Sequence, residues 1–282
     1  WGNYKLIFIN GYGAQLDTFP TFKESKFNLE GLKEKLNNEG ERKIVLLNFP
    51  NNPTGYTPTV AEVKEIVESI KKAAESGKKI LVICDDAYFG LVYEEGIEKN
   101  SIFSQLADIH ENILAVKIDG ATKEDYVWGF RVGFITYGIK NNTEELYKAL
   151  ESKTAGAIRG NISNACNLSQ SLVLHAFTSS TYQNEKKEKY ELLKSRYDEV
   201  VKVLKDKKYE EVFTALPYNS GYFMCIELRE SIDAEKIRQI LLNKYDTGII
   251  AMPPIIRIAF SAVAKENIEE LFENIYKACN KV

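Results

Sequence analysis

Residues 112–137 read NILAVKIDGATKEDYVWGFRVGFITY, and the rest of the chain is best understood from this segment. Its two ends, 112–118 and 132–137, are apolar runs typical of β-strands. We therefore expect Lys123 in a small Gly-containing loop where one strand ends, and Arg131 where the next begins. A reactive amine beside a guanidinium that holds an anion is one interpretation of this pair. The other is a solvated lysine, because charged side chains are mostly exposed.

The segments before this stretch alternate between strand and helix patterns. Continuous apolar runs at 43–49 and 79–84 predict strands of the kind buried on both faces of a parallel sheet. Helices are predicted at 29–36, after the capping residue Asn28, and at 60–75, where apolar residues follow a helical stripe. The alternation predicts an α/β fold, with a mostly parallel sheet sandwiched by helices.

Polar segments follow three of the predicted strands, at 50–55, 85–88 and 119–123. Ligands of such sheets bind at the carboxyl ends of the strands. We therefore expect these three segments to contribute to one binding site.

The pattern changes after residue 143. Helices are predicted first, at 143–155, 164–180 and 182–206. A compact α+β arrangement follows, with short strands at 210–215, 221–228, 248–251 and 255–260 and helices at 233–244 and 265–280. We place a domain boundary in the long charged helix, which gives a large domain at 1–188 and a small α+β domain at 189–282.

Composition narrows the class of protein. The 282 residues are 44% hydrophobic and 27% charged, with a net charge of −3 and no long basic patch for nucleic acid. No apolar run has the length of a membrane span. The four cysteines are widely spaced, which favours reduced thiols and a cytoplasmic protein. Two histidines leave little for a zinc site or a histidine-based triad, so we expect no metal.

Several short motifs, each modest alone, occur in one order along the chain. They are Trp1-Gly-Asn-Tyr4, Asn52-Pro-Thr-Gly55, Asp85-Asp-Ala-Tyr88, Gly120-Ala-Thr-Lys123, Arg131-Val-Gly133, the run 221–228 (GYFMCIEL) and the run 256–261 (IRIAFS). Together they resemble the fold-type I aminotransferases that use pyridoxal phosphate (PLP), and within them the class I/II group. The resemblance runs the whole length of the chain.

This resemblance implies cofactor roles for five residues. Lys123 would form a Schiff base with the PLP aldehyde and later move a proton. Asp85 would pair with the protonated pyridine nitrogen, and Tyr88 and Asn52 would hydrogen-bond the phenolate oxygen. Arg131 would hold the phosphate with its planar donors.

Further roles follow from the same resemblance. Trp1 would stack on the cofactor ring, and Arg257 would grip the substrate α-carboxylate, with Asn52 nearby. Arg159 resembles an arginine that some members send into the neighbouring subunit to bind a side-chain carboxylate, and Ser163 would approach a phosphate there. A helix-end arginine bound to carbonyls or solvent is the alternative for Arg159.

Asp86 is an alternative pyridine partner, but the family spacing Asp-x-x-Tyr selects Asp85. The sequence also departs from the family. Gly120 stands where Ser or Thr often supplies a hydroxyl to the phosphate, with Thr122 beside the lysine instead, and the connection 248–257 is short. The family's N-terminal region has no counterpart here, so we expect an incomplete large domain, weak PLP binding and low activity.

The resemblance implies a transaminase of amino acid metabolism that exchanges an amino group between an L-amino acid and a 2-oxo acid, as a homodimer. Two alternatives stay open. One is a PLP-dependent C–S lyase or synthase of the same fold, and the other is an aminotransferase-like ligand-sensing domain of a transcription regulator.

Overall fold

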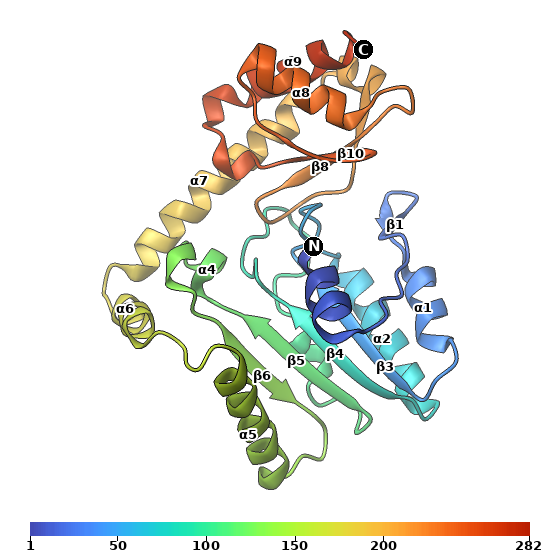
Figure 1. The fold of residues 1–282 in the computed structure, drawn as a ribbon, viewed down its shortest axis with the longest axis vertical. Helices are drawn as coiled ribbons and strands as arrows, with labels where there is room; N and C mark the ends of the chain where they lie inside the picture. The colour runs from blue at the N-terminus through green and yellow to red at the C-terminus, as the bar shows by residue number, and fades with distance from the viewer. The chain divides into compact units, whose positions relative to one another are not determined.

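The computed structural model describes all residues, 1–282, and divides them into two compact units. Unit 1 comprises 1–49, 58–90 and 96–182, and unit 2 comprises 50–57, 91–95 and 183–282. Figure 1 shows the chain as a ribbon. The division between 182 and 183 lies near our predicted boundary, but two earlier segments also belong to unit 2. The domain boundary at 188 itself stays a prediction.

Unit 1 is built on a four-stranded sheet of order β3-β4-β5-β6 (Figure 1), whose strands are β3 (Arg42–Asn48), β4 (Lys79–Asp85), β5 (Ile113–Asp119) and β6 (Phe134–Gly138). The first three are parallel and β6 is antiparallel, which confirms the mostly parallel sheet. In the register, Asn48 lies opposite Asp85, and Asp85 lies opposite Ile118. The carboxyl ends of β4 and β5 therefore meet at one edge of the sheet.

Two helices of unit 1 begin with strong capping signals. The Asn28 side chain accepts the Gly31 N–H, and Thr59 and Glu62 form a capping box. The elements that complete unit 1 are η1 (Lys5–Gly11), β1 (Phe22–Lys23), β2 (Lys26–Phe27), α1 (Leu29–Asn37), α2 (Val60–Glu75), α3 (Phe103–Leu106), α4 (Ala121–Glu124), η2 (Trp128–Phe130), α5 (Glu144–Asn161) and α6 (Asn167–Phe177).

One local expectation in this unit was wrong. The predicted loop that carries Lys123 contains the single helical turn α4. Apolar packing holds this turn in place, because Ala121 is buried in a small cluster with Val132 and Val173. The lysine therefore stands on an anchored turn directly after β5.

Unit 2 is an α+β arrangement around a second, antiparallel sheet of order β7-β8-β10-β9. Its sheet and helices share an apolar core in which Ile226, Ile256 and Phe272 are fully buried. Its elements are α7 (Tyr182–Val203, whose first residue belongs to unit 1), η3 (Lys207–Glu211), β7 (Phe213–Ala215), β8 (Met224–Leu228), α8 (Ala234–Tyr245), β9 (Ile250–Met252), β10 (Ile255–Ile258), η4 (Phe260–Ala262), η5 (Lys265–Asn267) and α9 (Ile268–Cys279).

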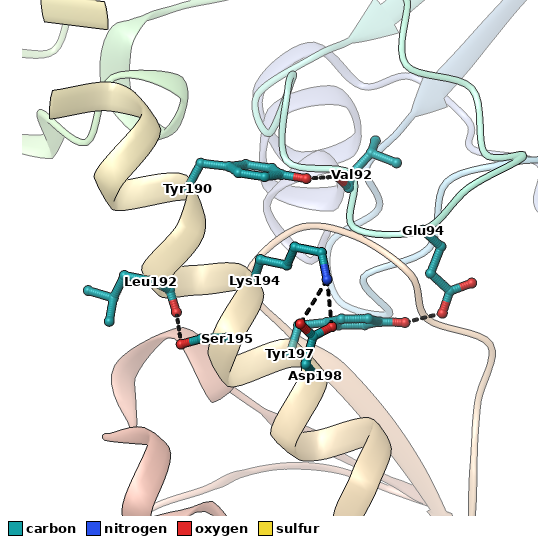
Figure 2. A network of polar contacts seen from close by, with 8 residues as sticks. All are labelled: Val92, Glu94, Tyr190, Leu192, Lys194, Ser195, Tyr197 and Asp198. Carbon is teal, nitrogen blue, oxygen red and sulfur yellow. Dashed lines mark hydrogen bonds and ion pairs between the residues drawn. The ribbon is translucent and has the colours of Figure 1, made fainter. Parts of the chain in front are cut away.

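The segment 91–95 belongs to unit 2 because polar and aromatic contacts fix it to α7. Figure 2 shows these contacts: the Tyr190 hydroxyl donates to the carbonyl of Val92 over 2.5 Å, and the Tyr197 hydroxyl donates to the Glu94 carboxylate. The ring of Tyr93 lies 5.0 Å from that of Tyr197. Contacts with residues about 100 positions later in the sequence thus place this segment in unit 2.

Cys84, Cys225 and Cys279 are buried, Cys166 is exposed, and all four are free thiols. None of the helices combines the length and the apolar character that crossing a membrane requires.

Candidate active site

Lys123 lies at the carboxyl end of β5, over an aromatic ring supplied by the neighbouring strand end. Its Nζ is 5.3 Å from the centroid of the Tyr88 ring. Burial lowers the pKa of the Lys123 amine, and the positive charge of Arg131 lowers it further, against the opposing effect of Asp85. A lysine that loses its proton more readily is a better nucleophile toward a carbonyl.

Asp85 ends β4 and presents a carboxylate whose position is fixed from two directions. The main-chain N–H of Ala87 donates to Oδ1 over 3.1 Å, and the hydroxyl of Tyr4 donates to Oδ2. Burial and the charge of Asp85 raise the pKa of the Tyr4 hydroxyl, which therefore stays protonated and acts as a donor. Each carboxylate oxygen can accept more than one hydrogen bond, so Asp85 can still accept from a cationic ring nitrogen.

Asp86 has a different environment from its neighbour. Its side chain is 5% exposed, and its Oδ2 atom has no hydrogen-bond partner. Burial is the main reason why the pKa of this carboxyl rises to about 7. A carboxyl that is partly protonated at neutral pH is a poor partner for a pyridinium, which favours Asp85 in that role.

The strand ends around Gly120 approach each other closely. A Cβ atom at Gly120 would lie 2.5 Å from the carbonyl oxygen of Val132 and 2.7 Å from the Cα of Gly133. A side chain at this position would require the two main chains to move apart, so the arrangement favours glycine at position 120. Arg131 is in the left-handed region (φ 55°), and its guanidinium donates to the Trp128 carbonyl over 3.1 Å.

Two further predicted residues, Asn52 and Arg257, come together in unit 2. The Arg257 guanidinium, on β10, donates to the Asn52 Oδ1 atom over 3.2 Å. The same guanidinium stacks on the ring of Phe223, 4.4 Å from its centroid. The planar Arg257 guanidinium, with one face against the Phe223 ring, can donate two parallel hydrogen bonds, and this geometry suits a carboxylate.

Trp1 and Arg159 are less closely tied to these groups. The Trp1 ring makes an edge contact with Tyr4 at 5.2 Å and is 46% exposed. Arg159, in the last turn of α5, donates to the Ser163 hydroxyl over 2.7 Å. Their predicted roles in stacking and in carboxylate binding stay predictions.

The residues of unit 1 fit PLP by their chemistry. Lys123 offers an amine for the aldehyde, Asp85 a fixed acceptor for the ring nitrogen, Tyr88 a phenol, and Arg131 a guanidinium for the phosphate. Sequence reasoning gave no role to Tyr4, which holds Asp85. The signal was present, because Tyr4 closes the motif Trp1-Gly-Asn-Tyr4.

Comparisons with known proteins show the family of the chain. The sequence model of the family "Aminotransferase class I and II" matches residues 1–275, so the chain belongs to that family. Aminotransferases of this family use PLP. The solved structure of an aminotransferase from Anaerococcus prevotii is similar over 99% of this chain, with a TM-score of 0.86 and 28% identity. A probable aspartate/prephenate aminotransferase of Aquifex aeolicus is 26% identical over 100% of this chain.

The chain is shorter than these relatives. It covers 68% of the Anaerococcus structure and 68% of the Aquifex protein. The aspartate aminotransferase of Thermotoga maritima is 31% identical over 140 residues, which are 48% of this chain and 33% of that protein. The structure of the aspartate aminotransferase from Thermotoga maritima (TM-score 0.76, 22% identity, covering 99% of this chain and 68% of that chain) shares the fold.

Proposed function

We propose that this protein is a PLP-dependent aminotransferase that exchanges an amino group between an L-amino acid and a 2-oxo acid. The observation that carries the proposal is the arrangement at the ends of β4 and β5. There the partly buried Lys123 amine lies over Tyr88, and Asp85 is fixed as an acceptor. Family membership supports the same reaction.

Each side chain of unit 1 has a defined part in this proposal. When bound, PLP supplies an aldehyde that captures amines and a ring that accepts electron density. The lowered pKa of Lys123 favours the unprotonated amine, which would bind the aldehyde of the cofactor and could take up a proton in turn. Asp85, whose carboxylate Tyr4 fixes, would keep a proton on the ring nitrogen through its charge. Arg131 would bind the phosphate and balance its charge.

In unit 2, we assign the substrate α-carboxylate to Arg257. Its planar donors, stacked on Phe223, bind a carboxylate through two parallel hydrogen bonds and so fix the substrate in orientation. Asn52 contributes a second polar group at the same position. Arg159, if supplied to a neighbouring subunit, would select substrates with a second carboxylate.

The aspartate and LL-diaminopimelate aminotransferases among the relatives act on amino acids with additional charged groups. Substrates of this kind are therefore the first to test here. We also propose that the protein is a homodimer and that it is located in the cytoplasm. The four free thiols support the location.

The test is the half-reaction between the PLP-loaded chain and an amino donor. We expect release of the matching 2-oxo acid from the wild type and none from Lys123→Ala. Lys140→Ala, which removes an exposed lysine of the same unit, is the control and should behave as the wild type. Release of ammonia or a thiol in place of transferred nitrogen would assign the protein to the lyases. Undiminished transfer by Lys123→Ala would overturn the assignment of Lys123.

A further inference from the structure

The loop 50–57, which carries Asn52, is held in unit 2 by a buried hydrogen-bond network. The carbonyl of Gly55 accepts three hydrogen bonds, from the N–H groups of Asn219 (2.9 Å) and Ser220 (2.8 Å) and from the Ser220 hydroxyl (2.9 Å). Ser220 is fully buried. One carbonyl thus ties the loop to the turn before β8.

The side chain of Asn219 adds a second connection. Its Oδ1 accepts the N–H of Thr57 over 2.9 Å, and its Nδ2 donates to the Thr57 carbonyl over 2.9 Å. This reciprocal pair has the pattern of two paired peptide groups in a sheet. Asn219 is 5% exposed and Thr57 is 5% exposed, so neither bond competes freely with water.

Gly55 allows the two segments to come this close. It has a φ of +71°, and a Cβ atom there would lie 1.9 Å from the carbonyl oxygen of Phe223. Only glycine fits both the left-handed conformation and the space. The main chains of the loop and of the segment leading into β8 are therefore in direct contact.

The network leads from Asn219 to the carboxylate-binding pair. The Asn51 side chain accepts the N–H of Thr54 (3.2 Å) and its hydroxyl (2.8 Å), which fixes the turn that contains Asn52. On the other side, β8 pairs with β10 so that Cys225 lies opposite Arg257. The hydrogen bond between Arg257 and Asn52, 3.2 Å long, therefore joins two segments that the network also connects.

We propose that Asn219 and Ser220 are positioning residues that hold Asn52 and Arg257 together before a carboxylate binds. This inference rests on the proposed role of Arg257 and extends it to residues that do not touch the ligand. A site that is already ordered binds more tightly, because less conformational freedom is lost on binding. Asn219 and Ser220 therefore determine carboxylate affinity without contacting the carboxylate.

The experiment compares two buried asparagines of unit 2. Asn219→Ala removes the pair with Thr57, whereas Asn274→Ala removes a side chain that is also buried (9% exposed) and donates to Thr247 over 3.2 Å. The probe is propionate, titrated into the full chain while the guanidinium NMR signal of Arg257 is followed. Amide hydrogen exchange at Thr57 reports the loop in the same samples.

We expect Asn219→Ala to speed exchange at Thr57 and to weaken propionate binding roughly fivefold, an effect of the size of one net hydrogen bond. Asn274→Ala should change neither. Equal propionate affinity in Asn219→Ala and the wild type would overturn the proposal, as would an equal loss in both variants. If the wild type itself does not respond to propionate, the carboxylate role of Arg257 fails, and the positioning role fails with it. Normal exchange protection at Thr57 would then show that the network itself is intact.

A second variant covers the case in which Asn219→Ala does not fold. Thr57→Val removes the hydroxyl that lies 2.8 Å from the Ser220 hydroxyl while keeping the shape of the side chain. We expect a smaller loss of propionate affinity in Thr57→Val and its recovery in Thr57→Ser. An unchanged affinity in Thr57→Val would contradict a positioning role for Ser220.

Discussion

Asp86 provides a quantitative prediction about stability. Its carboxyl is 5% exposed, and burial raises its pKa to about 7 from 3.8, with further increases from the charges of Asp119 and Asp85. A hydrogen bond from Ser101 and the charge of Lys117 act in the opposite direction. The nearby thiol of Cys84 is itself kept neutral, because burial raises its pKa to about 12.

The sign of the pH effect follows from this raised pKa. Between pH 3.8 and about 7 the folded chain keeps a proton at Asp86 that the unfolded chain has lost, so stability falls as the pH rises through this interval. From pH 5 to pH 8 the two pKa values give a loss of about 2 to 3 kcal/mol from this single group. The Asp86→Asn variant cannot ionise and avoids that loss.

The assay is urea unfolding of the wild type and of Asp86→Asn at pH 5 and at pH 8. On going from pH 5 to pH 8, the variant should become more stable relative to the wild type by about 2 kcal/mol of unfolding free energy. All other titrating groups are common to both proteins and cancel in this comparison. A difference that stays the same at the two pH values would refute the idea that Asp86 is protonated in the fold.

Three more substitutions test particular contacts. Gly55→Ala should lower the free energy of unfolding by about 3 kcal/mol or more, because alanine is strained in the left-handed conformation and its Cβ would lie 1.9 Å from a carbonyl oxygen. A loss under about 1 kcal/mol in urea unfolding would contradict that geometry. Gly120→Ser restores the hydroxyl of the family pattern, but its Cβ would lie 2.5 Å from a carbonyl oxygen, so thermal unfolding should show a loss of stability of about 1 to 3 kcal/mol. Tighter PLP binding without that loss would contradict the close approach at Gly120. Tyr4→Phe removes a donor to Asp85 and should weaken PLP binding several-fold in a fluorescence titration, whereas unchanged binding would exclude Tyr4 from the site.

Much of the fold follows from local sequence patterns. The continuous apolar runs predicted β3, β4 and β5 to within a residue or two. The expected burial on both faces does not hold at every position, because Ile44 on β3 is 73% exposed and Ile118 on β5 is 43% exposed. Adjacent parallel strands bring their carboxyl ends together, so Asp85 and Lys123 could be expected at one edge from sequence alone.

The remainder depends on contacts that no local pattern reports. The bond from Tyr4 to Asp85 joins residues 81 positions apart, and the pair of Thr57 with Asn219 joins residues 162 apart. The space around Gly120 depends on how closely β5 and β6 converge. For the same reason, the sequence did not indicate that the loop carrying Asn52 belongs to unit 2.

The most direct test of the central claim is covalent trapping of PLP. The chain is incubated with an equimolar amount of PLP, reduced with borohydride, digested and analysed by mass spectrometry. We predict that the reduced cofactor is found on the peptide that contains Lys123, that Lys140→Ala gives the same result, and that Lys123→Ala loses the adduct. Cofactor spread evenly over exposed lysines, or an undiminished adduct in Lys123→Ala, would contradict the assignment of Lys123.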